Sequence, residues 1–319
     1  MQDAVIDGTD LSNTVIPETV TTDAVMKDAP EQSESPMEQQ SDTPVKWPRK
    51  VDLFGVDYSP TTYDEATETI IAAASQDIPG TVSCHAVHAL ISASCDPQLR
   101  EMINAFDMVT PDGQPVRWAM NLLHGTKLRD RVYGPELTVR LCQRAAEKGV
   151  SIYLYGGSPA VVEKLQTNLQ DRYPGLIVAG YESPPFRALT PEEDQQAVDR
   201  INASGAGIVF IGLGCPKQDI FAFQHRDRIR AVQVCVGAAF DFHADTLPMA
   251  PRWMQRSGLE WFFRLVQEPK RLWKRYLVTN SIYLRKLFAA LLDPRRVRQQ
   301  RQQTNRLMAS HLVLKGNRS

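Results

Sequence analysis

The sequence lacks the features that mark secreted and membrane-spanning proteins. Its five cysteines are an odd number and form no Cys-x-x-Cys pair, which argues against a disulfide framework and against a zinc site. No apolar run is long enough to cross a bilayer, and the first residues lack the charged-then-apolar pattern of a signal peptide. We therefore expect reduced thiols, a cytoplasmic location and, if the protein meets a membrane, contact with its surface only.

Several catalytic signatures are missing as well. There is no Walker motif, no Gly-x-Ser-x-Gly elbow and no complete Gly-x-Gly-x-x-Gly fingerprint, which disfavours acyl transfer and dinucleotide binding. The histidines His85, His88 and His243 lack the spacing of metal ligands, so we expect neither a metal nor another cofactor. The interpretation of the chain as a nicotinamide oxidoreductase would rest on a predicted parallel sheet alone.

What the chain does have is a strong asymmetry of charge. The net charge of the 319 residues is only −1, yet residues 1–46 hold ten acidic and two basic side chains. Residues 261–319 hold fourteen Lys and Arg against two acidic side chains. The acidic segment is nearly free of aromatic residues and is expected to be a disordered leader. The basic segment indicates an anionic partner, either nucleic acid or an acidic membrane surface.

Between residues 47 and 258, short apolar runs alternate with helical patterns and glycine-rich turns. This alternation predicts a Rossmann-like α/β core, with a mostly parallel sheet covered by helices on both faces. The expected strands are 51–56, 81–85, 150–155, 176–181, 207–211 and 232–236. The expected helices are 62–75, 86–103, 116–123, 135–148, 159–172, 191–203 and 216–229.

After residue 258 aromatic side chains interleave with basic ones, which predicts an amphipathic helical appendage over 259–295. We expect residues 296–319 to form a basic flexible tail. Three interpretations of the appendage stay open: a helix packed on the core, a nucleic-acid surface, or a membrane surface. No recognised nucleic-acid-binding motif supports the second. We favour the third, with aromatic rings at headgroup level and cations on anionic phosphates.

The first candidate site is the loop around Asp112, in the stretch Thr110–Trp118. Pro111 favours an extended Thr110, and we expect Gly113 to adopt an angle that few side chains tolerate. Asp112 would then be held at a strand end, where ligands meet open α/β sheets. The alternative is that Asp112 only caps the next helix.

Two glycine-rich turns, Gly156–Ser158 and Gly212–Gln218, follow predicted strands and precede helices. Helix N-termini offer free N–H groups and a positive dipole end to phosphate. Lys217 and Gln218 would lie in the first turn of their helix, where a diphosphate would bind. The carboxylate Asp241 follows the last strand. It would either bind sugar hydroxyls or only cap a helix. Alternatively, the glycines only permit tight turns.

Eight stretches, in this order, have the character of family motifs. They are Thr110-Pro-Asp-Gly-Gln-Pro-Val-Arg-Trp118, Arg131-Val-Tyr-Gly-Pro-Glu-Leu137, Tyr153-Leu-Tyr-Gly-Gly-Ser-Pro159, Arg172-Tyr-Pro-Gly-Leu176, Gly212-Leu-Gly-Cys-Pro-Lys-Gln-Asp219, Val236-Gly-Ala-Ala-Phe-Asp-Phe242, Ala250-Pro-Arg-Trp-Met254 and Gly258-Leu-Glu-Trp-Phe-Phe-Arg-Leu-Val-Gln-Glu-Pro-Lys-Arg-Leu-Trp-Lys-Arg-Tyr276. Over roughly residues 51–277 the chain resembles the WecG/TagA/CpsF family of bacterial glycosyltransferases.

The resemblance implies an inverting, metal-independent transfer of a sugar from a UDP-sugar to a polyprenyl-diphosphate-linked saccharide. Such enzymes work at the inner face of the cell membrane and build wall polymers, capsules or exopolysaccharide. By resemblance, Asp112 is the general base, and Arg264 and Arg271 of the appendage reach the site, with Lys274 where a third Arg is found. Nucleic acid is not expected as a partner, and homo-oligomerisation stays open.

The remaining expected site residues would bind substrate. They are Thr110, Gly113, Gln114, Gly156, Gly157, Gly214, Lys217, Gln218, Asp241 and His85.

One departure from the family concerns the Thr-x-Asn pair that members commonly carry before the Asp loop. The matching positions here are Cys84 and Ala86. Because Ala86 cannot supply the hydrogen bond of an Asn, His85 or His88 would substitute, or the substrate differs. A glucose-type or uronate-type donor therefore stands beside the acetamidosugars. The departure also motivates an alternative, a non-catalytic scaffold that binds a nucleotide-sugar or a lipid.

Overall fold

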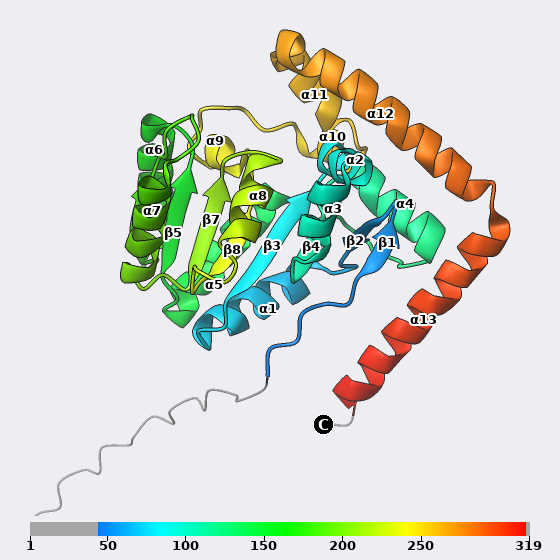
Figure 1. The fold of residues 1–319 in the computed structure, drawn as a ribbon, viewed down its shortest axis with the longest axis horizontal. Helices are drawn as coiled ribbons and strands as arrows, with labels where there is room; N and C mark the ends of the chain where they lie inside the picture. Colours follow the sequence, from blue (N-terminus) through cyan, green and yellow to red (C-terminus); the bar gives the residue numbers. More distant parts are fainter. Residues whose placement is uncertain (1–43, 317–319) are drawn as a thin grey trace, which may run out of the picture. The chain divides into compact units, whose positions relative to one another are not determined.

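A computed structural model describes residues 44–316 of the chain. Its centre is a six-stranded sheet in the order β4-β3-β8-β7-β5-β6, in which every neighbouring pair is parallel (Figure 1). The strands are β3 (Gly80–His85), β4 (Met108–Pro111), β5 (Ile152–Gly156), β6 (Val178–Glu182), β7 (Ile208–Gly212) and β8 (Val232–Cys235). The predicted fold class is confirmed.

The first predicted strand is instead a hairpin of β1 (Val51–Leu53) and β2 (Val56–Tyr58). The chain turns at Phe54 and Gly55, whose φ angles are 59° and 91°. The apolar run predicts one continuous strand because this turn lacks the usual Asn-Gly or Asp-Gly signal.

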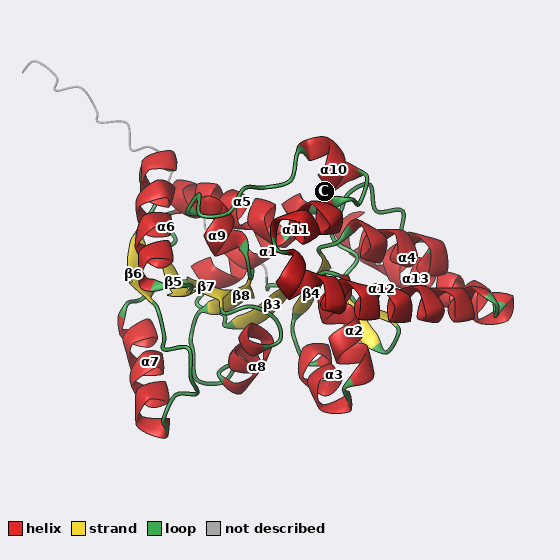
Figure 2. Cartoon of the chain, turned by 90° about the horizontal axis from the view of Figure 1, so that it is seen from above, coloured by secondary structure: helices red, strands yellow, loops and turns green. Residues whose placement is uncertain are grey.

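Helices cover both faces of the sheet (Figure 2). Alternate side chains of each strand enter two separate cores, as β7 illustrates: Ile208 and Phe210 pack on one face and Val209 and Ile211 on the other. One face carries α1 (Tyr63–Ser75), α5 (Gly134–Lys148), α6 (Pro159–Arg172) and α9 (Ala239–His243). The other carries α2 (Val87–Cys95), α3 (Pro97–Asn104), α4 (Gln114–His124), α7 (Pro191–Ala203) and α8 (Lys217–Gln224).

Local chemistry explains where several helices begin and end. Thr62 caps α1 by accepting from the N–H of Glu65, and Thr190 forms a reciprocal capping box with Glu193 at the start of α7. The helix predicted over 86–103 is two helices, because Asp96 caps α3 directly after α2 has ended. The helix predicted over 216–229 is shorter and ends at Gln224.

Four helices follow the core: α10 (Arg252–Arg256), α11 (Glu260–Gln267), α12 (Pro269–Leu291) and α13 (Pro294–Gly316). Helix α12 packs along α2 and also contacts α4, and α13 runs beside α4 (Figure 1). The segment 296–319, predicted as a flexible tail, is therefore helical as far as residue 316. Its Arg, Gln and Leu residues are good helix formers, and Arg301 anchors it by donating to the carbonyl of Leu122.

Within residues 44–316, no helix is both long and apolar enough to cross a membrane. The predicted acidic leader falls almost wholly outside the described residues, which begin at Pro44. Val45 and Trp47 already pack on the core beside α1.

Candidate functional site

A cavity of about 1430 Å³ lies at the carboxyl edge of the sheet. Loops after strands β3 to β8 line it, together with side chains of several helices, among them α2, α4, α8, α11 and α12. Because the sheet order is β4-β3-β8-β7-β5-β6, Asp112 after β4 and the Pro184–Leu189 loop after β6 stand at opposite ends. The glycine turns lie between them, so an elongated ligand can reach from one end to the other.

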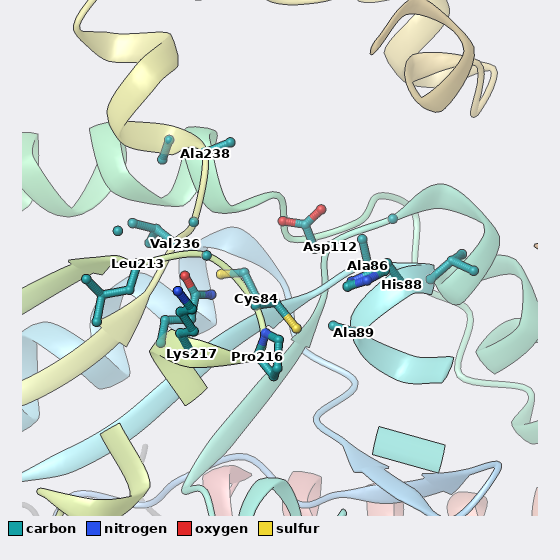
Figure 3. A pocket seen from close by; sticks show the side chains of 18 of the residues that line it. Cys84, Ala86, His88, Ala89, Asp112, Leu213, Pro216, Lys217, Val236 and Ala238 are labelled. Carbon is teal, nitrogen blue, oxygen red and sulfur yellow. The ribbon is translucent and has the colours of Figure 1, made fainter. Parts of the chain in front are cut away.

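Asp112 lies at the carboxyl end of β4 and lines the cavity (Figure 3). Its Oδ2 accepts a 2.8 Å hydrogen bond from the N–H of Gly134, the first residue of α5. The helix after the Asp112 loop begins at the cap residue Gly113 without a side-chain cap, so Asp112 does not cap α4. Burial raises the pKa of Asp112 to about 6, although Arg131 and the Gly134 N–H act in the opposite direction.

An ion pair stands beside this carboxyl. Arg131 Nη2 lies 2.6 Å from Glu260 Oε2, and the guanidinium sits 4.0 Å from the centre of the Tyr133 ring. The pair joins the core to α11. Charge on Glu260 raises the pKa of Asp112, whereas charge on Arg131 lowers it. The ion pair therefore tunes Asp112 without a direct hydrogen bond to it.

The glycines predicted for the site differ in backbone angle and in the space around them. Gly214 has φ 76° and a Cβ there would meet no atom within 4 Å, so its backbone faces the open cavity. Gly157, with φ 69°, also lines the cavity. Gly156 does not: its Cβ would come 2.6 Å from the Gly212 carbonyl carbon, and close strand packing requires glycine there. Gly113 has φ −93°, so the expected unusual angle is wrong.

Lys217 and Gln218 open helix α8 and both line the cavity. Gln218 is buried, and its Oε1 has no hydrogen-bond partner among the described residues. Gln114 also reaches the cavity wall, but its amide is engaged: it accepts from Arg117 at 2.7 Å and donates to Asp130 at 3.3 Å. Of these two amides, Gln218 has hydrogen-bonding capacity left for a ligand.

The C-terminal helices bring arginines to the cavity. Arg264 of α11 lies 5.6 Å from the centre of the Phe242 ring, and Arg271 of α12 pairs with Glu268. Asp241 lines the same wall, and burial raises its pKa while Arg264 and Arg271 lower it. Lys274, expected in place of a third arginine, is exposed and does not line the cavity, whereas the next residue, Arg275, does.

Besides Gly156, two further predicted substrate-binding residues lie outside the cavity lining. Thr110 is buried and donates to the carbonyl of Val132 at 3.2 Å. His85 is buried, and its Nε2 lies 3.2 Å from Asp219 Oδ1, which also accepts from Ser83 at 2.6 Å. These two side chains therefore contact buried protein groups beneath the cavity wall and do not face a ligand. The strand alternation that turns Cys84 to the cavity turns its neighbour His85 away.

The positions that depart from the family pattern lie next to Asp112. Cys84, Ala86 and His88 all line the cavity near its carboxyl (Figure 3). Burial, with help from the charge of Arg275, lowers the pKa of His88 to about 4, so its ring is neutral at physiological pH. His88, rather than His85, is the histidine in reach of a ligand.

The sequence did not single out Arg131, Glu260, Asp219 or Arg275 as site residues. The motif Arg131–Leu137 assigns no role to Arg131, whose ion-pair partner Glu260 is more than a hundred residues away in sequence. Asp219 is buried through a contact between β3 and α8. Only Arg275 carried a usable signal, because it follows Arg271 by four residues and so shares its helix face.

The comparison with known protein families matches residues 51–297 to the glycosyl transferase WecG/TagA/CpsF family. That match covers the parallel sheet, all loops that line the cavity, and helices α11 and α12, which supply Arg264, Arg271 and Arg275. With a carboxyl, glycine turns and cationic side chains converging on one cavity within the matched region, the chain belongs to the WecG/TagA/CpsF family of glycosyltransferases.

Proposed function

We propose that the protein is an inverting glycosyltransferase that moves a sugar from a UDP-sugar to a lipid-diphosphate-linked saccharide. The product would serve polysaccharide or wall-polymer synthesis. The observation that carries the proposal is the position of Asp112, a half-buried carboxyl with a pKa of about 6 on the wall of the cavity that also holds the glycine turns. A base with such a pKa is ionised at neutral pH and still accepts a proton readily.

In the proposed reaction the acceptor hydroxyl attacks the anomeric carbon of the donor sugar. As the new C–O bond forms, Asp112 takes the hydroxyl proton. The bond between the anomeric carbon and the diphosphate oxygen breaks, and UDP leaves with the electron pair on the face opposite the attack. This single displacement inverts the anomeric configuration. The Gly134 N–H holds the carboxyl in place during the transfer.

The leaving diphosphate needs positive partners. Lys217, Arg264 and Arg271 line the cavity, and α8 begins there with its free N–H groups. Preorganised cations and helix dipoles can stabilise the departing charge, which supports a metal-independent mechanism. Gly214 leaves room for the diphosphate to approach the backbone.

We further propose that the protein works on the cytoplasmic surface of the membrane. Exposed aromatic and aliphatic side chains gather on the C-terminal helices together with basic ones, and we call this the aromatic-basic surface: Trp253, Phe262, Val266, Lys270, Trp273 and Lys274. Amphipathic surfaces of this composition bind anionic bilayers at headgroup level.

The second candidate is a scaffold that binds a nucleotide-sugar or a lipid without transferring anything. It is favoured by the replacement of hydrogen-bonding side chains by Cys84 and Ala86 beside the base. Release of UDP from a panel of UDP-sugars, with a lipid-diphosphate saccharide as acceptor, separates the two functions.

The decisive variant is Asp112→Asn, which retains an oxygen for the Gly134 N–H. We expect it to bind UDP with unchanged affinity in calorimetry and to lose transfer by roughly 10²- to 10⁴-fold, the usual contribution of a general base. Asp130→Asn, a carboxylate outside the cavity lining, is the control and should retain turnover. Full turnover by Asp112→Asn would remove the base assignment.

A further inference from the structure

The cavity extends beyond Asp112 into a trough between helices α12 and α4. One stripe of α12 faces it, at the spacing that places side chains on one side of a helix. From the N-terminal end, the members of this stripe are Arg271, Arg275, Tyr276, Asn280, Tyr283, Leu284 and Leu287. The stripe is cationic where it meets the sugar-transfer region and apolar where it leaves it.

The opposite wall is a matching apolar stripe on α4, formed by Pro115, Trp118, Ala119 and Leu122. These residues also follow helical spacing, and Tyr283 ties the two walls together by donating to the carbonyl of Pro115 at 2.6 Å. Trp118, Leu122 and Leu284 are exposed although they line the cavity. Contiguous exposed apolar side chains in a concave site indicate a ligand with hydrocarbon.

Arg275 stands at the polar end of the trough, where the charge of Glu268 acts on it without forming an ion pair among the described residues. Its Nε is buried and has no hydrogen-bond partner among the described residues, and no carboxylate there forms an ion pair with it. Arg131 and Arg271, by contrast, are paired with Glu260 and Glu268. A buried donor left unsatisfied is costly, so Arg275 is set to receive an anion.

The second polar group at this end of the trough is His88, which is uncharged, whereas Arg275 is a cation. The charge of Arg275 helps to keep His88 neutral, with a pKa of about 4. A neutral imidazole can donate one hydrogen bond and accept another, so it suits a hydroxyl or a phosphate oxygen next to the Arg275 contact. Arg275 and the neutral His88 suit a phosphate group, and the apolar trough suits a hydrocarbon chain attached to it.

We propose that this trough is the acceptor's lipid subsite, in which Arg275 and His88 bind the prenyl-linked phosphate and the α12–α4 walls bind the first part of the prenyl chain. The assignment deepens the proposed transfer function and rests on it. From Arg275 to Leu287 the helix rises about 18 Å, enough for several prenyl units. The phosphate would lie near Asp112, with the attached sugar at the base and the chain leading out along α12.

Binding of a soluble prenyl diphosphate tests the subsite without any turnover. Farnesyl diphosphate is titrated calorimetrically into the full-length protein saturated with UDP, which keeps the diphosphate away from the nucleotide site. Inorganic diphosphate and farnesol are titrated in the same way. We expect farnesyl diphosphate to bind at least about tenfold more tightly than either fragment, because both ends of the site contribute. Equal affinity for inorganic diphosphate would overturn the lipid subsite.

Two variants locate the binding. Arg275→Gln should weaken farnesyl diphosphate by roughly tenfold or more, the loss typical of a charge-assisted hydrogen bond, and leave UDP affinity unchanged. Lys274→Gln, its exposed neighbour, is the control. Leu284→Gln should weaken farnesyl diphosphate by several-fold, whereas Leu277→Gln should not: the two leucines are 62% and 63% exposed on the same helix, but only Leu284 lines the cavity.

The outcomes separate this inference from the proposed function. Unchanged binding by both Arg275→Gln and Leu284→Gln would overturn the subsite even if the wild-type protein transfers sugar. Variant-sensitive farnesyl diphosphate binding by a protein that neither binds UDP nor transfers sugar would sustain the subsite and reject the enzyme. Circular dichroism checks that each variant is folded. Binding of farnesyl diphosphate by Arg275→Lys would support the subsite and show that it requires the charge of the side chain rather than its shape.

Discussion

Asp112 Oδ2 accepts a 2.8 Å hydrogen bond from the backbone N–H of Gly134, although 22 residues separate the two. The bond joins the end of an edge strand to the start of the helix α5 on one face of the sheet. It fixes the carboxyl at the cavity wall and lowers its pKa, while burial raises the pKa more strongly. The pKa of Asp112 therefore depends on the balance between burial and this hydrogen bond, and a pH profile can measure it.

The first prediction concerns the pH dependence of transfer. With Asp112 as the proposed base, kcat/KM should fall about tenfold per pH unit below a pKa of about 6. Glu260→Gln removes a charge that raises this pKa, so the acid limb should move to lower pH. Arg131→Gln removes a charge that lowers it, and the limb should move to higher pH. Shifts of the same sign would contradict the electrostatic account.

The second prediction concerns the stability of Asp112→Asn. The pKa of Asp112 is higher in the folded protein than its ordinary value of 3.8, so the folded state binds more protons between pH 4 and 6. Wild-type stability therefore decreases as pH rises through that window, and a neutral Asn avoids the loss. Urea denaturation at pH 7.5 should show the variant more stable by about 2 kcal/mol, after allowance for partial solvent exposure.

At about pH 3 the two proteins should be nearly equal in stability, because the wild-type carboxyl is then largely protonated in both states. A constant difference across the pH range would indicate a packing effect rather than the titration of Asp112.

The third prediction concerns the buried support beneath the cavity. Burial raises the pKa of Asp219, but the electrostatic attraction of His85, together with hydrogen bonds from His85 and Ser83, holds that pKa below its ordinary value. Asp219→Ala should lower the free energy of unfolding by about 3 kcal/mol, since it leaves buried polar partners without an acceptor. Ser83→Ala, which removes one donor, should cost about 1 kcal/mol.

The measurement is urea denaturation at pH 7. Because the Asp219 pKa is lowered on folding, its contribution is present above about pH 4 and is lost as pH falls further, so the effect of Asp219→Ala should shrink in acid. An undiminished effect at pH 3 would assign it to packing.

The fourth prediction concerns the aromatic-basic surface. Phe262 and Trp273 are 48% and 55% exposed. The double variant Phe262→Ser with Trp273→Ser should reduce binding to vesicles containing anionic lipid by at least about tenfold in sedimentation, given the apolar area withdrawn from the interface. Ile177→Ser, which changes a 51% exposed apolar residue on the core, is the matched control. Equal binding by both variants would place the membrane contact elsewhere.

Much of the architecture followed from the sequence alone. The spacing of apolar residues and the glycine turns predicted the parallel sheet, and helices α6 and α7 begin and end at the predicted residues. Caps such as Thr62 and Ser158 act on backbone only three residues away, so their effect is visible locally. The hairpin at Phe54 and the helical end of the chain were missed because neither turn chemistry nor distant packing was apparent.

For the site, the sequence by itself determined that a carboxylate, glycine turns and cationic residues follow successive strands, because parallel strands bring their carboxyl ends to one edge. Only the tertiary structure decided which side chains reach the cavity. It turned His85 toward Asp219 and placed His88 on the cavity wall, and it brought Arg275 rather than Lys274 to the cavity. These outcomes depend on which face of a strand or helix is covered by segments remote in sequence, and local residue order does not encode that choice.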